Sequence, residues 1–258
     1  MRTSPGLTMV IDTGLCTGAF TDLVDSHSGL IDLIKFGWGT ALVTHDLDRK
    51  AAILADAGIG FYFGGTLFEH HLWTDRLDDY LRLVERTGAT HIEVSNGTIP
   101  LDQHSKAEYV RRMSEHRPVL AEVGYKDAAR SANLTPAEWT DALREDLDAG
   151  AYMVITEARE SGRSGIAQAD GHLRTDVLDA VAAAVDIDRV MFEAPTKDLQ
   201  VDLITALGPE INLGNVATTD VVALETLRLG LRGDTLLQLT TGVDPAARKH
   251  RRQASAAQ

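Results

Sequence analysis

Charged side chains recur at or just beyond the ends of short apolar segments throughout this chain. Burying such charges without partners would cost several kcal/mol each. We therefore expect them to pair with one another or to hold a ligand, in a polar cluster suited to acid–base or metal chemistry. The acids are Asp12, Glu93, Glu122, Glu157 and Glu193, and the cations are Lys35, Lys126 and Arg159.

The excess of carboxylates over cations suggests a metal ion in this cluster. Hard carboxylate oxygens, with no His or Cys at the same positions, suit Mg²⁺ rather than Zn²⁺. The residues themselves do not decide which acids contact the ion. Our assignment gives the metal Asp12, Glu93, Glu157 and Glu193, and gives catalysis Glu122 and Ser95.

Eight short apolar segments would carry these side chains. They are mostly rich in β-branched or aromatic residues and lack the strict alternation of half-exposed strands, as expected of buried parallel strands. Nearly every one of them ends in a polar residue. The segments are 8–12, 31–36, 58–63, 91–95, 118–123, 153–158, 189–194 and 211–216.

Amphipathic stretches between these segments are typical of helices. The stretch 136–149 begins with a capping box formed by Thr135 and Glu138, with a proline at its first position. Further helices are predicted at 76–87 and 220–232.

The alternation of strands and helices predicts an α/β fold, either a closed barrel or an open doubly wound sheet. No Gly-x-Gly-x-x-Gly follows the first strand, so the dinucleotide-binding open sheet has no support. No linker rich in Pro, Gly or Ser divides the chain. We therefore predict a single (β/α)8 TIM barrel over residues 1–244, with its active site at the C-terminal strand ends. A basic and disordered tail is expected over 245–258.

In such a barrel, several residues are candidates for binding an anionic small molecule. Guanidinium groups pair well with oxyanions, which favours Arg159 and Arg163 beside Lys35. The loop after the eighth strand, a common phosphate site in barrels, contains Gly214 and Asn215.

Three other segments lie near the predicted mouth. We interpret the adjacent His70 and His71 as loop residues, because neighbouring side chains cannot both point at one ion from a helix or strand. The glycines of segment 64–66 would leave backbone N–H groups accessible. Segment 161–171 is either a mobile loop that closes over the site or a plain solvent loop.

Composition and charge exclude some partners. The net charge of −13 opposes binding to nucleic acid or to an anionic membrane. The sequence contains no run of about 18 apolar residues, the length needed to cross a bilayer. The N-terminus also lacks the apolar stretch of a signal peptide. The single cysteine, Cys16, precludes an internal disulfide, so a cytoplasmic location is predicted.

The peptides around the strand ends together resemble, in order, those of the phosphosulfolactate synthase family. The resemblance extends from about residue 6 to residue 236. The matching pieces are residues 6–12, 35–40, 64–69, 92–95, 122–126, 157–162, 192–195, 212–215 and 224–235.

This resemblance implies a Mg²⁺-dependent carbon–sulfur lyase of coenzyme M biosynthesis, which adds sulfite to phosphoenolpyruvate and gives phosphosulfolactate. Sulfite would attack the methylene carbon, and the substrate carboxylate would hold the developing charge as an aci-carboxylate. Lys126 matches the lysine that the family uses as general acid, and it would protonate the neighbouring carbon. By resemblance we also expect a homo-oligomer.

Four positions depart from the family pattern. Thr13 and Tyr125 replace lysines, Asn96 replaces an aspartate, and Leu199 replaces a glutamine. Each lost charge-assisted contact to an anion would matter by roughly 1.5–3 kcal/mol. Two alternatives therefore stay open: an enzyme that uses the same aci-carboxylate chemistry on another acid or nucleophile, and a non-catalytic, stress-related family member.

Overall fold

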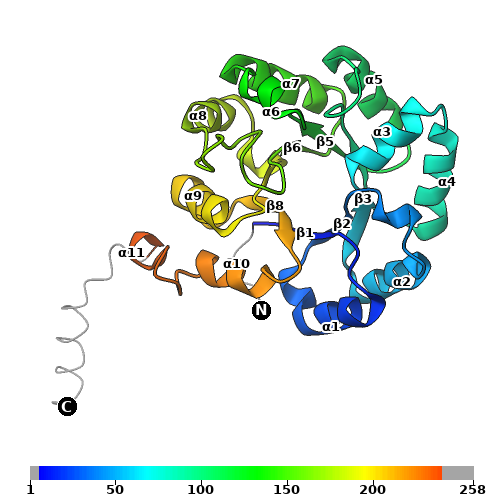
Figure 1. Ribbon diagram of the computed structural model, residues 1–258, viewed down its shortest axis with the longest axis horizontal. Helices are drawn as coiled ribbons and strands as arrows, with labels where there is room; N and C mark the ends of the chain where they lie inside the picture. Colours follow the sequence, from blue (N-terminus) through cyan, green and yellow to red (C-terminus); the bar gives the residue numbers. More distant parts are fainter. Residues whose placement is uncertain (1–5, 240–258) are drawn as a thin grey trace.

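The computed structural model describes residues 6–239, and it confirms the predicted single (β/α)8 barrel. Eight parallel strands form one sheet in the order β3-β2-β1-β8-β7-β6-β5-β4, curled around a central axis (Figure 1). The predicted tail, 245–258, lies outside the described residues. The strands are β1 (Thr8–Asp12), β2 (Leu33–Phe36), β3 (Gly60–Phe63), β4 (Ile92–Val94), β5 (Val119–Val123), β6 (Met153–Thr156), β7 (Val190–Glu193) and β8 (Asn212–Ala217).

Helices surround the strands and cover their outer face (Figure 1). No helix among residues 6–239 is long and apolar enough to cross a membrane. The helices are α1 (Thr17–His27), α2 (Leu47–Ala57), α3 (Gly65–Trp73), α4 (Leu77–Thr87), α5 (Gln103–Ser114), α6 (Ala128–Ala132), α7 (Pro136–Asp148), α8 (Thr175–Ala184), α9 (Lys197–Leu207), α10 (Val221–Arg228) and α11 (Leu236–Leu239).

Local sequence explains where several helices begin and end. The predicted capping box is present at α7, where the Thr135 hydroxyl accepts from the Glu138 N–H and the Glu138 carboxylate accepts from the Thr135 N–H. Helix α10 is shorter than predicted, because the chain leaves the helix at Leu229 and Gly230 follows with a φ of 64°.

The assignment of His70 and His71 to a loop was wrong, because both lie in α3. The helix was not predicted because Gly64 and Gly65 precede the histidines, and adjacent glycines usually indicate a turn. His71 is buried and its Nδ1 lies 2.8 Å from the Leu67 carbonyl oxygen. Both histidines are therefore residues of an ordinary amphipathic helix.

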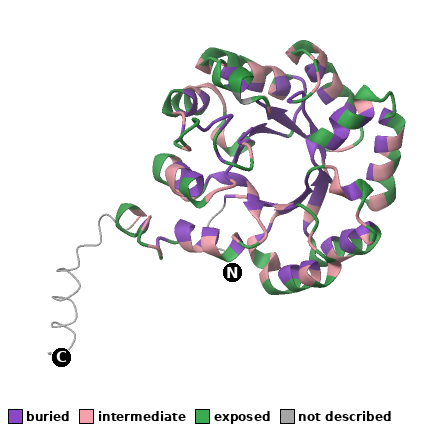
Figure 2. Ribbon diagram, viewed as in Figure 1, coloured by how far each residue is buried: buried purple, intermediate pink, exposed green. Residues whose placement is uncertain are grey.

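The strands separate two apolar cores, and both faces of the strands are buried (Figure 2). One core lies between the strands and the helices, and a smaller one fills the barrel interior below its mouth. The interior core contains Met9, Leu33, Tyr62, Leu120, Met153, Ile155 and Met191.

Strand register extends this interior face to the mouth. Residues paired in register on neighbouring parallel strands face the same side of the sheet. Ile11 of β1 pairs with Lys35 of β2, which pairs with the interior residue Tyr62 of β3. Ile11 and Lys35 therefore point inward, whereas Asp12 is placed with Phe36 on the outer face.

Strands β3 and β4 are the two ends of the sheet, and the barrel closes between them. The Thr90 N–H donates to the Phe61 carbonyl oxygen at 2.9 Å, and the Phe61 N–H donates to the Thr90 hydroxyl at 2.9 Å. Nearer the mouth, the Gly65 N–H donates to the Glu93 carboxylate. These bonds connect the two ends across the seam.

Candidate active site

A cavity of about 430 Å³ opens at the C-terminal ends of the strands. Its walls come from residues as distant in sequence as Ile11 and Asn215, so most strands of the barrel contribute to it. Eight charged side chains line the cavity. They are Lys35, Glu93, Glu122, Lys126, Glu157, Arg159, Glu160 and Glu193.

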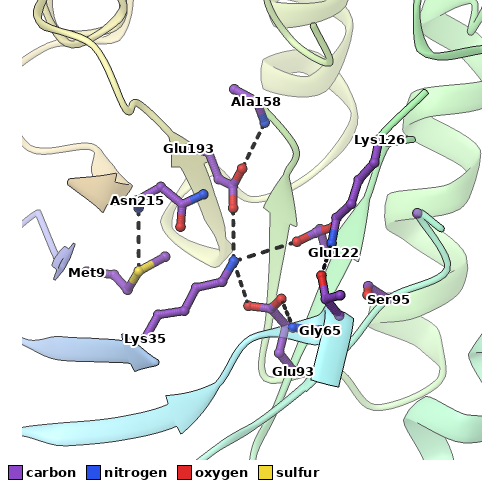
Figure 3. Close-up of polar contacts among 12 residues, drawn as sticks. Met9, Lys35, Gly65, Glu93, Ser95, Glu122, Lys126, Ala158, Glu193 and Asn215 are labelled. Carbon is purple, nitrogen blue, oxygen red and sulfur yellow. Dashed lines mark hydrogen bonds and ion pairs between the residues drawn. The ribbon is translucent and has the colours of Figure 1, made fainter. Parts of the chain in front are cut away.

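Lys35 lies at the centre of this cluster, surrounded by carboxylates from three strands (Figure 3). Its Nζ atom lies 3.1 Å from Glu93, 3.1 Å from Glu193 and 3.7 Å from Glu122. All four side chains are buried. Lys35 is therefore a buried counterion for the strand-end acids.

The environment of Lys35 fixes its protonation state. Burial alone would lower the pKa of Lys35, but the carboxylates of Glu93, Glu193 and Glu122 outweigh it and hold the pKa well above its ordinary value. Burial likewise raises the pKa of Glu193, against the opposing charge of Lys35. Lys35 thus keeps its positive charge throughout the neutral range.

Glu122 and Glu157 form a second, differently balanced pair. Burial and the nearby charge of Glu122 raise the pKa of Glu157 well above its ordinary value. Although burial opposes it, the charges of Lys126 and Lys35 lower the pKa of Glu122. One Glu122 oxygen, Oε1, is buried and has no hydrogen-bond partner in the described structure. The pair can therefore accept a proton or a cation.

Lys126 extends over the rim of the cavity toward Glu122 (Figure 3). Its ammonium contacts the Thr66 hydroxyl of α3. Burial alone would lower the pKa of Lys126, but Glu122, Glu157 and Glu69 raise it above its ordinary value. Arg159 supports the same segment, because its Nη1 donates to the Lys126 carbonyl oxygen at 3.1 Å.

Asn215 supplies an uncharged polar group on the opposite wall. Its backbone adopts a φ of 51°, and its N–H lies 3.4 Å from the Met9 sulfur (Figure 3). Its side-chain oxygen is buried and has no hydrogen-bond partner among the described residues. Since orphaned buried polar atoms are rare, this one is a candidate ligand contact.

The structure thus brings together most of the residues that the sequence suggested. Lys35, Glu93, Glu122, Lys126, Glu157, Arg159, Glu193 and Asn215 all line the cavity. The structure leaves out of the lining Asp12, Ser95, Arg163 and Gly214.

Asp12 lies on the outward face of β1 and contacts helix α2 instead of the cavity. Its Oδ2 atom lies 2.5 Å from the Nζ of the buried Lys50. Its Oδ1 accepts from the N–H groups of Gly14 and Leu15, so Asp12 shapes the loop that follows β1. Because this carboxylate points away from the other acids, it cannot share a metal ion with them.

The other three residues each lie beside the site. Ser95 is buried next to the cavity and donates its hydroxyl hydrogen to Glu69. Arg163 is exposed in the loop after β6 and lines two separate surface hollows. Gly214 faces the barrel interior, where an added Cβ would lie 2.8 Å from Met9.

None of the four residues that depart from the family pattern, Thr13, Asn96, Tyr125 and Leu199, lines this cavity. Thr13 lines a hollow formed by the loops after β1 and β2. Tyr125 lines a hollow beside α7, and the Arg130 guanidinium stacks 3.6 Å from its ring centroid.

Sequence reasoning missed several residues that support the site from the helices. They are Lys50 of α2, Thr66 and Glu69 of α3, and Lys106 of α5, which donates to the Glu122 carbonyl oxygen at 2.8 Å. Fully buried lysines are rare unless they are paired. Their only sequence signal is a charge on the apolar side of an amphipathic helix.

The donor set of the cavity fits Mg²⁺ in part. Within residues 6–239 no three His, Cys, Asp or Glu side chains form a ready-made metal site. Mg²⁺ is often held by one or two carboxylates, with substrate oxygens and waters completing its shell. Lys35 lies 3.1 Å from both Glu93 and Glu193 and offsets part of their charge. Glu122 keeps one buried oxygen without a hydrogen-bond partner in the described structure, so Glu122 and its neighbour Glu157 are the pair whose chemistry fits the ion.

Fold and cavity define the class of protein: a (β/α)8 barrel with an enzyme-like site of carboxylates and cations at the C-terminal strand ends. The model of the (2R)-phospho-3-sulfolactate synthase family matches residues 2–234. The chain therefore belongs to the phosphosulfolactate synthase family, a family of enzymes.

Individual relatives agree with this membership. A phosphosulfolactate synthase of Bacillus subtilis is 44% identical over 89% of this chain and 92% of its own length. One of Methanothermobacter thermautotrophicus is 40% identical, over 90% of this chain and 91% of its own length. The 3-hexulose-6-phosphate synthase of Salmonella typhimurium shares the fold, with a TM-score of 0.53, 16% identity, and coverage of 90% and 100% of the two chains.

Proposed function

We propose that this enzyme adds sulfite to phosphoenolpyruvate and forms phosphosulfolactate. The observation that carries the proposal is the position of Lys126, whose ammonium lies at the rim of a cavity lined by Glu122 and Glu157. Family membership supports the same reaction. Neither Thr13 nor Tyr125, the two residues that motivate the open alternatives, lines the cavity.

The reaction needs one nucleophilic attack and one proton transfer. The sulfur lone pair of sulfite forms a bond to the methylene carbon of phosphoenolpyruvate. The electrons of the carbon–carbon double bond move to the substrate carboxylate, which becomes an aci-carboxylate. Lys126 then gives its Nζ proton to the carbon that bears the phosphate, and it regains a proton from water. A lysine with a raised pKa is protonated before this step, as a general acid must be.

Binding of the substrate anions requires polar groups that the protein's own contacts do not fully occupy. Lys35 was a sequence candidate, but its charge is shared among three carboxylates. Arg159 is partly exposed, and the Asn215 oxygen has no protein partner among residues 6–239. We therefore assign the phosphate to Arg159, with Asn215 accepting a hydrogen bond from a bound water or a protonated substrate oxygen.

We further propose that Glu122 and Glu157 hold the Mg²⁺ ion. Bound there, the ion would supply positive charge to the substrate carboxylate as negative charge develops on it. The protein's own part would be to keep Glu122 ionised, which the charges of Lys126 and Lys35 support, and to hold Glu157 beside it through the pairing of β5 with β6. Glu157, whose pKa is raised by burial and by Glu122, would release its proton when the ion binds.

The test follows loss of phosphoenolpyruvate in the presence of sulfite and Mg²⁺. Activity that requires both, and that EDTA abolishes, is the expected result. Lys126→Met should lower kcat by about 10²- to 10⁴-fold, the usual contribution of a positioned general acid. Lys197→Met, on an exposed ion pair of α9, is the matched control and should retain full activity. No turnover by the unaltered enzyme, or an active Lys126→Met variant, would overturn the proposal.

A further inference from the structure

A buried glutamate behind the cavity has an unusual set of partners. Glu69 of α3 is 1% exposed, and no cationic side chain among residues 6–239 forms a salt bridge with it. Its carboxylate instead accepts four hydrogen bonds from the segment that follows β4. The donors are the Ser95 hydroxyl and the N–H groups of Gly97 at 3.2 Å, Thr98 at 2.8 Å and Ile99 at 2.9 Å.

These bonds fix the segment that also holds the backbone of Lys126. The Gly97 carbonyl oxygen accepts from the Lys126 N–H at 3.1 Å. Gly97 lies so close to Lys126 that an added Cβ would contact its side chain at 3.4 Å. Glu69 is thus connected to the backbone of Lys126 through a single rigid turn.

The same helix also contacts the end of the Lys126 side chain. Thr66 precedes Glu69 by three residues, so both lie on one face of α3. The Thr66 hydroxyl contacts the Lys126 ammonium. Helix α3 therefore contacts the Nζ atom of Lys126 directly. It is connected to the Lys126 backbone indirectly, through the turn formed by residues 97–99.

We propose that Glu69 is a positioning residue for Lys126, acting with Thr66 to hold its ammonium over one face of the bound substrate. This inference rests on the proposed function for its chemical consequence. An uncharged side chain could not satisfy three converging N–H groups and a hydroxyl, because a carboxylate is the acceptor that offers about four lone-pair sites. The buried charge of Glu69 is explained by this task.

The expected defect is specific to proton delivery. Glu69→Gln keeps the shape but places an amide NH₂ against N–H donors, so the turn and Lys126 must shift. A displacement of about 1 Å in a catalytic group can lower the rate by about 10²-fold. We expect kcat to fall about 10- to 100-fold, with KM for phosphoenolpyruvate within about threefold of the original value.

Stereochemistry gives a readout that a loss of folded protein would not change. A fixed Lys126 protonates one face of the aci-carboxylate and yields one enantiomer at the phosphate-bearing carbon. If Lys126 is displaced, solvent protonates both faces, and the second enantiomer should appear in the product of Glu69→Gln. Thr66→Val removes only the hydroxyl contact and should show the same defect in milder form. If Glu69→Gln fails to fold, Thr66→Val serves as the test variant in its place.

Amide hydrogen exchange tests the positioning independently of the reaction. Exchange should accelerate in residues 95–99 and at Lys126 in Glu69→Gln, without added substrate. Asp186→Asn alters an exposed carboxylate that accepts a hydrogen bond from the backbone N–H of Asp188 before β7, and it is the matched control that should change neither segment. If exchange accelerates in Glu69→Gln but the unaltered enzyme does not add sulfite, the proposed function is rejected and the positioning role of Glu69 stands. Unchanged exchange at Lys126, or unchanged kcat and product stereochemistry in an active enzyme, would overturn the role of Glu69.

Discussion

Replacing Lys35 by methionine removes the counterion of three buried carboxylates while keeping most of the side-chain volume. Lys35, Glu93, Glu122 and Glu193 are each less than 10% exposed, and the ammonium lies 3.1, 3.1 and 3.7 Å from the acids. Removing one partner of a buried ion pair typically costs about 3–5 kcal/mol, because the other charge stays buried without compensation. We expect Lys35→Met to lose about this much free energy of unfolding.

This loss can be measured by thermal and urea unfolding at pH 8 with EDTA present. For a domain of this size, each kcal/mol shifts Tm by about 2–4 °C, so a decrease of roughly 6–20 °C is expected. Lys197→Met breaks an exposed pair with Asp234 at 2.9 Å and should cost about 1 kcal/mol or less. The double variant Lys35→Met/Glu193→Gln should recover part of the loss, because one uncompensated charge is gone.

The result that would refute this reasoning is a Lys35→Met variant as stable as the Lys197→Met control. It would mean that the strand-end acids are protonated or hydrated, and that Lys35 is not their counterion. A double variant less stable than Lys35→Met would also contradict the electrostatic explanation, since a purely packing defect should grow with each substitution.

Three further predictions test the loops and the surface. Gly165→Ala should lower stability and raise KM, because the new Cβ would lie 1.8 Å from the Glu157 carbonyl oxygen at a φ of 72°; melting and steady-state kinetics check this, and normal values would contradict it. Asn215→Ala should raise KM for phosphoenolpyruvate, since the Asn215 side-chain oxygen has no protein partner in the described structure; an unchanged KM would exclude Asn215 from binding. The same variant should lower Tm slightly, because alanine tolerates the φ of 51° less well than asparagine does. Hydrogen bonds from Thr135 lower the pKa of Glu138. The stability that these bonds contribute is therefore present above the ordinary pKa of glutamate and is lost as pH falls through the lowered value. Glu138→Gln should reduce the acid-induced loss of stability measured by urea unfolding between pH 3 and pH 6, and an unchanged pH dependence would contradict the assignment.

The fold could be predicted because its signals are local. Short apolar segments alternate with amphipathic stretches, and the α7 capping box needs only Thr135, Pro136 and Glu138. Helix α3 could not be predicted in the same way, because it begins at glycines that indicate a turn. Gly65 is required by a contact far away in sequence: a Cβ there would lie 2.3 Å from the Ser95 hydroxyl oxygen.

The site could be predicted as a set of charges but not as an arrangement of them. Alternation along β1 separates Asp12 from Ile11, yet both strand faces are apolar in sequence, so nothing local says which face is the interior. The pairing of Asp12 with Lys50, 38 residues away, decides the question, and it exists only after α2 packs against β1. The partners of Glu69 are likewise fixed by tertiary packing.

The charges of the cavity connect its stability to its chemistry. Its lining contains five carboxylates but three cations, so a fully ionised cavity would repel the two anions of the proposed reaction. Lys35 offsets part of this repulsion through its ion pairs with Glu93, Glu122 and Glu193. It does not reach Glu157, whose pKa is raised well above its ordinary value by burial and by Glu122. A divalent ion beside Glu122 and Glu157 would balance the remaining charge, so anion binding should depend on Mg²⁺ while folding does not.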